Sequence, residues 1–136
     1  MRDLLNKFAE KYNFAPQKPI KYKKSIELDK LKQYINPLEN PPWTNVSPIS
    51  KQEISDCISK KEYLDPQSSK RDSSTTRQDH IKRIAYLVVN KDSKPISLRI
   101  MNNINCTDGN HRLAAAIYRE DEFVECYLTM LNDIEI

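Results

Sequence analysis

The chain has 136 residues and contains a single glycine, Gly109. At the usual frequency of about 7%, a chain of this length carries roughly nine or ten. Glycine is the residue that adopts positive φ, or lets the backbone approach a neighbour closely, without a steric penalty. The other turns are made with eight prolines and with asparagine, aspartate and serine. We therefore expect Gly109 to fill a position with a backbone requirement that the other turns lack.

Length and composition fit one soluble domain. A chain of this size buries roughly two-thirds of its unfolded surface, which is enough for one core. Hydrophobic residues make up 38% and charged residues 30%, with a mean hydropathy of -0.74, which lies outside the disordered range. No apolar run approaches the roughly 18 residues of a membrane span, and the N-terminus mixes charges into its apolar stripe, unlike a secretion signal. We expect a cytoplasmic protein with no membrane partner.

The cysteines and histidines limit the metal chemistry. Cys57, Cys106 and Cys126 are odd in number and lack the spacing of a zinc site, so we expect neither a disulfide framework nor a structural zinc. Cys106 is expected to be a buried strand residue. Because His80 and His111 are the only histidines, a metal ion is expected to be held by phosphates and carboxylates.

Charge is distributed unevenly along the chain. Residues 1–33 hold nine Lys and Arg against four Asp and Glu, whereas residues 107–136 hold two against seven. Such asymmetry can steer an anionic partner, and it also fits complementary surfaces inside one fold. Both interpretations stay open.

The hydrophobic pattern predicts a mixed order of helices and strands. Helical spacing is found in four segments: residues 2–12, 50–63, 75–90 and 108–118. The second of these begins with a capping box, Ser50 followed by Glu53. Strand-like segments cover residues 25–31, 95–100 and 123–130. We therefore expect an α+β fold, with a mixed sheet flanked by helices and an extra N-terminal helix.

Two stretches between these elements are expected to lack regular structure. Four prolines within residues 36–48 predict a long, stiffened loop, and loops of that length are often functional. Lys21–Lys24 is expected to be a solvated approach to the next strand. This divides the chain into an N-terminal helix with a basic linker, residues 1–23, and a domain over residues 24–136.

The residues around the glycine form the most specific motif, TDGNHRLAAAIYR. Thr107 or Asp108 is expected to cap a helix whose first-turn amides have no internal partner and lie at the positive end of the helix dipole. A phosphate fits there, with Arg112 as a fork of donors and His111 as a donor or proton carrier. The alternative is that Asp108 is only a cap, and that His111 and Arg112 lie at the surface.

This segment resembles the signature of the ParB/sulfiredoxin-like superfamily. The sequence DGNHR matches the DGxHR motif of the free-serine kinases in that superfamily, and the ParB spacing of glycine, arginine and alanine ends here at Ala115. Asn110 stands where sulfiredoxins have their cysteine, so sulfinate reduction is not expected. The resemblance covers about residues 24–130 and implies a small nucleotide-binding domain.

The resemblance also implies roles for the motif residues. Gly109, Asn110 and Arg112 would contact the phosphates of a nucleoside triphosphate, ATP or CTP. Asp108 would bind Mg²⁺ and share the catalytic work with His111.

A third catalytic residue is implied by the opening strand. The kinases place a glutamate after that strand, and Glu39 in SIELDKLKQYINPLE is the best match, at a longer spacing. The alternative is an exposed loop carboxylate. In the same loop, Trp43 is expected either to stack on a base or to anchor the loop on the core.

The helix expected over residues 75–90 adds candidate ligand contacts. His80 and Arg83 lie three residues apart and share a face with Arg77, one turn earlier. The resemblance implies that this helix comes near the nucleotide, which makes His80 and Arg83 phosphate or base contacts. The alternative is a solvated polar face opposite the apolar stripe. Thr76 and its neighbours, at the helix start, are a second candidate anion site.

Two functions are expected. The first is an NTPase or small-molecule kinase that binds a nucleotide with Mg²⁺ and hydrolyses or transfers its phosphoryl group. The second is a DNA-associated or regulatory protein of plasmid or phage type, without efficient catalysis. In that case its basic first third, Lys18, Lys21, Lys23 and Lys24, would contact the DNA backbone. A further alternative is a protein that binds another protein and has lost catalysis.

Overall fold

The computed structural model describes residues 20–68 and 75–130. The chain divides into two compact units. The first, here the sheet unit, consists of Met1–Ile35, Lys94–Gly109 and Glu122–Ile136. The second, the helical unit, consists of Asn36–Ser93 and Asn110–Asp121. The expected helix over residues 2–12, and Lys18, lie outside the described residues.

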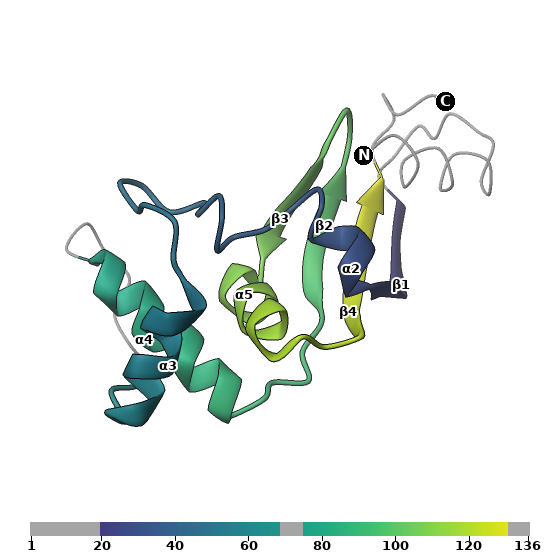
Figure 1. Ribbon diagram of the computed structural model, residues 1–136. Helices are drawn as coiled ribbons and strands as arrows, with labels where there is room; N and C mark the ends of the chain where they lie inside the picture. The colour runs from purple at the N-terminus through teal and green to yellow at the C-terminus, as the bar shows by residue number, and fades with distance from the viewer. Residues whose placement is uncertain (1–19, 69–74, 131–136) are drawn as a thin grey trace. The chain divides into compact units, whose positions relative to one another are not determined.

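The sheet unit contains a four-stranded mixed sheet in the order β1-β4-β2-β3 (Figure 1). Its strands are β1 (Ile20–Glu27), β2 (Ile96–Ile100), β3 (Ile104–Asp108) and β4 (Phe123–Met130). β4 pairs antiparallel with β1 and parallel with β2, and β2 pairs antiparallel with β3. One helical turn, α2 (Leu28–Leu31), follows β1 directly.

Alternation of side chains gives this sheet one buried face. On β4, Val124, Cys126 and Leu128 are buried while their neighbours in the sequence are exposed. β2 buries Ile96, Leu98 and Ile100 in the same way. This period of two is the pattern of a sheet with one face in the core and one in water.

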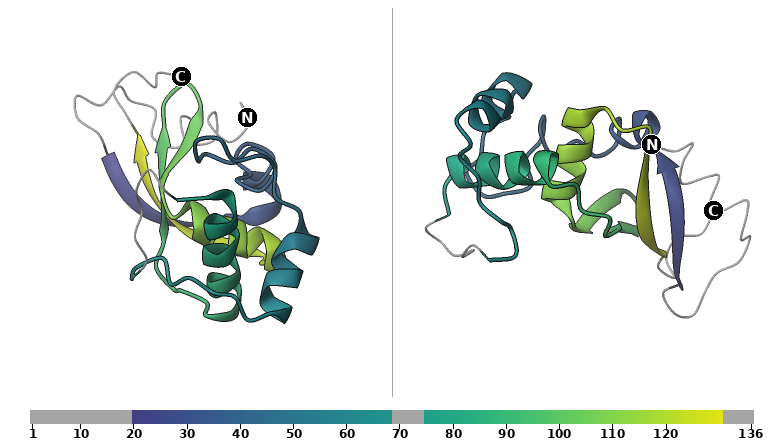
Figure 2. Two further views of the ribbon diagram at one scale, coloured as in Figure 1. Left: turned by 90° about the vertical axis from the view of Figure 1, so that its left-hand side faces the viewer. Right: turned by 90° about the horizontal axis from the view of Figure 1, so that it is seen from below.

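The helical unit contains three helices: α3 (Lys51–Ser59), α4 (Arg77–Val89) and α5 (Asn110–Arg119). α4 contacts both α3 and α5, and Figure 2 shows α3 and α4 lying side by side. Ile54, Ile84 and Leu113, one from each helix, are fully buried. Within the described residues, no helix of either unit is long and apolar enough to cross a bilayer.

The α+β class and the mixed sheet are confirmed. The strand predicted over residues 123–130 is β4, residue for residue, and the strand predicted over 95–100 is β2. The loop over residues 36–48 contains no helix or strand. The helix predicted to end near residue 63 ends at Ser59, because Lys61 takes a left-handed conformation with φ 55°.

The start of the sheet differs from the prediction. β1 begins at Ile20, so Lys21–Lys24, expected as a solvated approach, lie inside the strand and pair with β4. A lysine-rich strand is typical of a sheet edge, and β1 is an edge strand. The segment expected as a strand over residues 25–31 turns into α2, because Leu28 and Leu31 are spaced for one helical face.

β3 was not predicted as a separate strand. Ile104 is its only fully buried residue, so the segment carries almost no hydrophobic pattern. Cys106 lies in a strand, as predicted, but the prediction that it is buried is wrong. Its side chain is half-buried, and its Sγ donates to the carbonyl of Asp108 at 3.2 Å.

Candidate functional site

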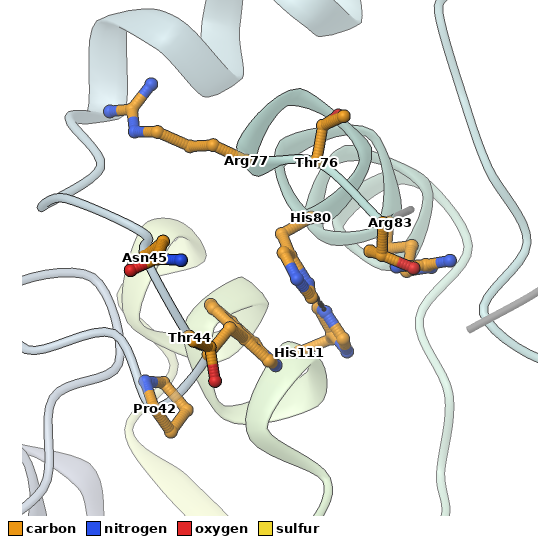
Figure 3. Close-up of a pocket in the computed structure, with 10 residues that line it drawn as sticks. Pro42, Thr44, Asn45, Thr76, Arg77, His80, Arg83 and His111 are labelled. Carbon is orange, nitrogen blue, oxygen red and sulfur yellow. Dashed lines mark hydrogen bonds between the residues drawn. The ribbon is translucent and has the colours of Figure 1, made fainter. Parts of the chain in front are cut away.

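Both histidines of the chain and its single tryptophan meet in the helical unit. Nδ1 of His80 lies 2.9 Å from Nε2 of His111, and the two side chains point toward one another (Figure 3). The indole ring of Trp43 stacks on both imidazoles, with ring centroids 4.4 Å and 4.5 Å away and planes inclined by 18°. We call these three side chains the ring cluster.

The hydrogen bond inside the ring cluster constrains the protons of the pair. One imidazole must donate and the other accept, since two N–H groups facing each other repel. Both histidines are only 8% exposed, so little water is available to take the place of this bond. The hydrogen bond therefore holds one ring N–H between the two imidazoles.

The ring cluster lines a cavity of about 800 Å³, the size of a site for a small organic ligand. The other described lining residues come from the loop, from the two residues before α4 and from α4 itself: Pro42, Thr44, Asn45, Thr75, Thr76, Arg77 and Arg83. Of the lining residues that the structure describes, none is acidic. The cavity is therefore polar and suited to a ligand that carries negative charge.

Arg77 lines the cavity but uses its guanidinium elsewhere. Its Nη1 and Nη2 donate to the two carboxylate oxygens of Glu53 at 2.7 Å and 2.9 Å. It also donates to the carbonyls of Ser47 and Pro48. In Figure 3 it points away from the histidine pair. Arg77 therefore ties the loop and α3 to the start of α4.

Glu53 is held in its charged form by these contacts. Its carboxylate accepts from Arg77 and, in the capping box of α3, from the backbone N–H of Ser50 at 2.8 Å. The hydrogen bonds from Arg77, followed by the one from Ser50, lower the pKa of Glu53 from 4.5 to about 2. These hydrogen bonds of Glu53 with Arg77 and Ser50 stabilise the structure beside the cavity.

The start of α4 is capped by its own side chains. The Thr76 hydroxyl accepts from the backbone N–H of Asp79, and the Asp79 carboxylate accepts from that of Thr76. The backbone hydrogen bond from Thr76 lowers the pKa of Asp79. These two amides are occupied, so the anion site expected here has fewer free donors than a bare helix end.

Arg83 is the cation placed deepest in the cavity wall. It lies two residues after Ile81 on α4 and is 1% exposed. A guanidinium keeps its charge at every accessible pH. The solvated polar face that was the alternative for His80 and Arg83 is therefore contradicted, because both side chains are buried.

Gly109 has the backbone requirement that its scarcity predicts. Its φ is 93°. Asn45, Lys61 and Glu120 also have positive φ, between 55° and 60°, which lies in the small left-handed region open to any L-residue. Gly109 lies outside that region, so a side chain there would clash.

The motif after the glycine is split by the structure. Asn110 begins α5, and His111 turns inward to the ring cluster, which contradicts a surface position. Arg112 forms an ion pair with Asp92, Nη1 to Oδ2 at 3.6 Å, and does not line the cavity.

The two expected carboxylates lie outside the cavity lining. Asp108 is an exposed residue at the end of β3. Glu39 is exposed in the loop, where its backbone N–H donates to Oδ1 of Asn36 at 3.3 Å.

The structure thus brings together His80, Arg83 and His111 of the expected site residues. Trp43 was expected to stack on a base or to anchor the loop, and its stacking on two histidines was missed. The only sequence signal for it was scarcity, because one tryptophan and two histidines are all that the chain has.

No protein-only metal centre is present among residues 20–68 and 75–130, where no three His, Cys, Asp or Glu side chains gather as ligands. Comparison with family models, with curated proteins and with solved structures found no match for this chain. The functional argument therefore rests on the cavity and on the motif residues themselves.

Proposed function

We propose that this chain binds a nucleoside triphosphate or a closely related phosphate ester in the ring-cluster cavity. The observation that carries the proposal is the gathering of both histidines, the only tryptophan and the buried Arg83 around one cavity without a described acidic lining residue. Arginine and histidine donors are the usual partners of phosphate oxygens. Thr44 and Asn45 add neutral hydrogen-bonding groups at the rim.

Within this proposal, Arg83 neutralises the charge of the phosphate, and the ring cluster acts as the general base. Phosphoryl transfer depends mostly on positioning and charge neutralisation. One imidazole accepts the proton of the attacking hydroxyl or water, while its own N–H, which it donates to the other imidazole, fixes its tautomer. Trp43 stacks on the pair and keeps both rings in that orientation.

The proposal retains Mg²⁺ as an ion that enters with the phosphates. Mg²⁺ in phosphoryl-transfer sites is commonly bound by one or two carboxylates, water and the substrate's own phosphates. Asp108 is the carboxylate that the resemblance assigns to it. Glu39 is the second carboxylate, proposed from the resemblance alone.

Arg83 and Arg112 are competing candidates for the phosphate. Arg83 lines the cavity, whereas Arg112 is paired with Asp92. In titrations of ATP and CTP with and without Mg²⁺, followed by calorimetry and by Trp43 fluorescence, we expect Arg83→Met to weaken binding by about tenfold to hundredfold, the effect of a lost charged hydrogen bond. Arg83→Lys should retain more affinity than Arg83→Met. Arg112→Ala should have the smaller effect.

Two outcomes contradict this assignment. If neither nucleotide binds the unmodified chain, the nucleotide proposal is wrong. If Arg112→Ala abolishes binding and Arg83→Met does not, the phosphate lies at the DGNHR helix start instead.

The regulatory alternative also binds the nucleotide but does not hydrolyse it or transfer its phosphoryl group efficiently. Phosphate release with and without Mg²⁺ should be lost in His111→Gln while nucleotide binding persists, if the histidine pair is catalytic. Binding without any release by the unmodified chain identifies a regulatory nucleotide-binding protein instead.

A further inference from the structure

The face of the sheet that is not buried carries charges and aromatic rings in an ordered arrangement. We call it the outer face. Its exposed residues on three of the strands are Lys21, Lys23, Ser25 and Glu27 on β1, Arg99 on β2, and Phe123, Glu125 and Tyr127 on β4; on the edge strand β3 the exposed residues Asn105 and Asp108 pair with Arg99 and Ser97. All of them belong to the sheet unit.

Two large aromatic side chains lie on the outer face. Phe123 is 49% exposed and Tyr127 is 47% exposed. Residues four apart on a strand lie on the same side of the sheet. An exposed aromatic pair with charged neighbours is typical of an interaction surface rather than of a solvated one.

The charges on the outer face are separated along the strands. The register places Lys21 beside Thr129, and Thr129 beside Arg99, at one end of the face. Lys23 follows beside Tyr127. The other end is acidic.

At that acidic end, Glu125 pairs with Ser25 and Phe123 pairs with Glu27. The outer face therefore changes from basic to acidic over the length of β1.

The basic end is not neutralised by the chain that the structure describes. Among those residues, Lys21, Lys23 and Arg99 form no ion pair. Glu27 at the acidic end contacts Lys30 at 3.5 Å, with both side chains more than half exposed, and such pairs contribute little. Both ends are thus exposed in the part of the chain that the structure describes.

We propose that the outer face binds the outer face of a second copy of this chain. The two-fold axis would lie between the two sheets and run perpendicular to the strands. It reverses the strand direction, so the basic end of one copy lies over the acidic end of the other. Lys21 of each copy then faces Glu27 of the other, and the aromatic residues of both copies are covered. Such a self-complementary pattern is the requirement for a two-fold interface.

A second copy fits this face better than a nucleic acid does. Single strands bind along basic grooves with aromatic stacking platforms. Here Glu125 lies next to Tyr127 on the outer face, and Glu27 lies beyond it, so a polyanion along the strands would meet two carboxylates. The second copy instead satisfies both signs of charge.

The size of the outer face predicts a weak dimer. β1 and β4 each contain eight residues, which span about 26 Å at about 3.3 Å per residue. A contact of this size falls near the lower limit of specific interfaces, roughly 1,000 Å² in total. We expect association in the micromolar range and a strong dependence on salt.

The decisive experiment uses two charge-reversed variants of the full chain. The first is Lys21→Glu with Lys23→Glu, and the second is Glu27→Lys with Glu125→Lys. Each variant alone places like charges opposite one another in its own dimer, so its dissociation constant should rise by more than about tenfold. Mixed together, the two place opposite charges at every contact and should form a heterodimer. Sedimentation across the micromolar range, at low and high salt, measures all three.

The control variant reverses two lysines away from the outer face. Lys60→Glu with Lys61→Glu changes the net charge by the same amount as the first variant, at two exposed residues of the helical unit. It should dimerise like the unmodified chain, and circular dichroism should show every variant folded.

Three outcomes overturn the proposal. A chain that stays monomeric throughout, or single variants that dimerise normally, excludes this interface. A monomeric chain whose outer face binds a single-stranded oligonucleotide, with binding lost in the first variant, assigns the face to nucleic acid instead.

Discussion

The two units of this chain bury different kinds of residue. In the sheet unit the buried side chains are apolar and alternate with exposed ones along each strand. The buried polar side chains of the described chain, His80, Arg83 and His111, all lie in the helical unit. Burying polar groups is unfavourable unless they are hydrogen-bonded. The sheet unit therefore gains stability from an apolar interior, whereas the helical unit also bears the cost of burying three polar side chains.

The largest effect should come from the sheet core. Leu128 is fully buried on β4, between β1 and β2 in the sheet order. We expect Leu128→Ala to lower the free energy of unfolding by about 2–5 kcal/mol, since it leaves a cavity in a close-packed core. Urea denaturation measures it. The control Thr129→Ala, at the next residue, should change stability much less, and equal losses in both variants would contradict a one-sided sheet.

The same alternation made the sheet partly predictable. A period of two over residues 123–130 is enough to give β4, because each residue's environment follows from its immediate neighbours. β3 was missed as a separate strand because Ile104 is its only buried residue. β1 was misplaced because its pairing with β4 compensates for a lysine-rich sequence.

The cavity was far less predictable. Spacing on one helix places His80 and Arg83 on one face, and the glycine count indicates a special backbone at Gly109. The ring cluster, in contrast, joins Trp43, His80 and His111 from three segments. Their contact depends on tertiary packing, which no local pattern encodes. The ion pair of Arg112 with Asp92 was likewise not predicted, because the motif says nothing about a partner outside it.

A second prediction tests whether the histidine pair serves stability. His111→Leu or His80→Leu removes one partner and leaves a buried ring nitrogen without its hydrogen bond, so each should destabilise the chain by about 1–3 kcal/mol. Replacing both histidines by leucine removes both polar groups at similar volume. The double variant should therefore lose less stability than the sum of the two single losses.

Urea denaturation of the four proteins forms a double-mutant cycle. Strong coupling with a stable double variant supports a pair kept for chemistry, and the double variant should then bind no nucleotide. If the two losses simply add, the pair stabilises the helical unit and the contrast between the units is weaker than we state.

The smallest effect should appear at acid pH, and only in the helical unit. Glu53 has a pKa of about 2 in the folded chain against 4.5 normally. Its interactions with Arg77 and Ser50 therefore stabilise the fold fully above about pH 4.5, and this contribution is lost as the pH falls through about 2. Glu53→Gln keeps a side chain suited to the capping box but removes the charge.

The difference in urea midpoint between the unmodified chain and Glu53→Gln should thus be constant near neutral pH and shrink from about pH 4.5 toward pH 2. The matched control is Glu120→Gln, whose ion pair with Lys51 is 3.1 Å long but has side chains that are 77% and 52% exposed. Exposed pairs contribute little, so this control should show a small difference at every pH. If the difference in urea midpoint between the unmodified chain and Glu53→Gln stays constant down to pH 2, the interactions of residue 53 with Arg77 and Ser50 do not depend on its charge.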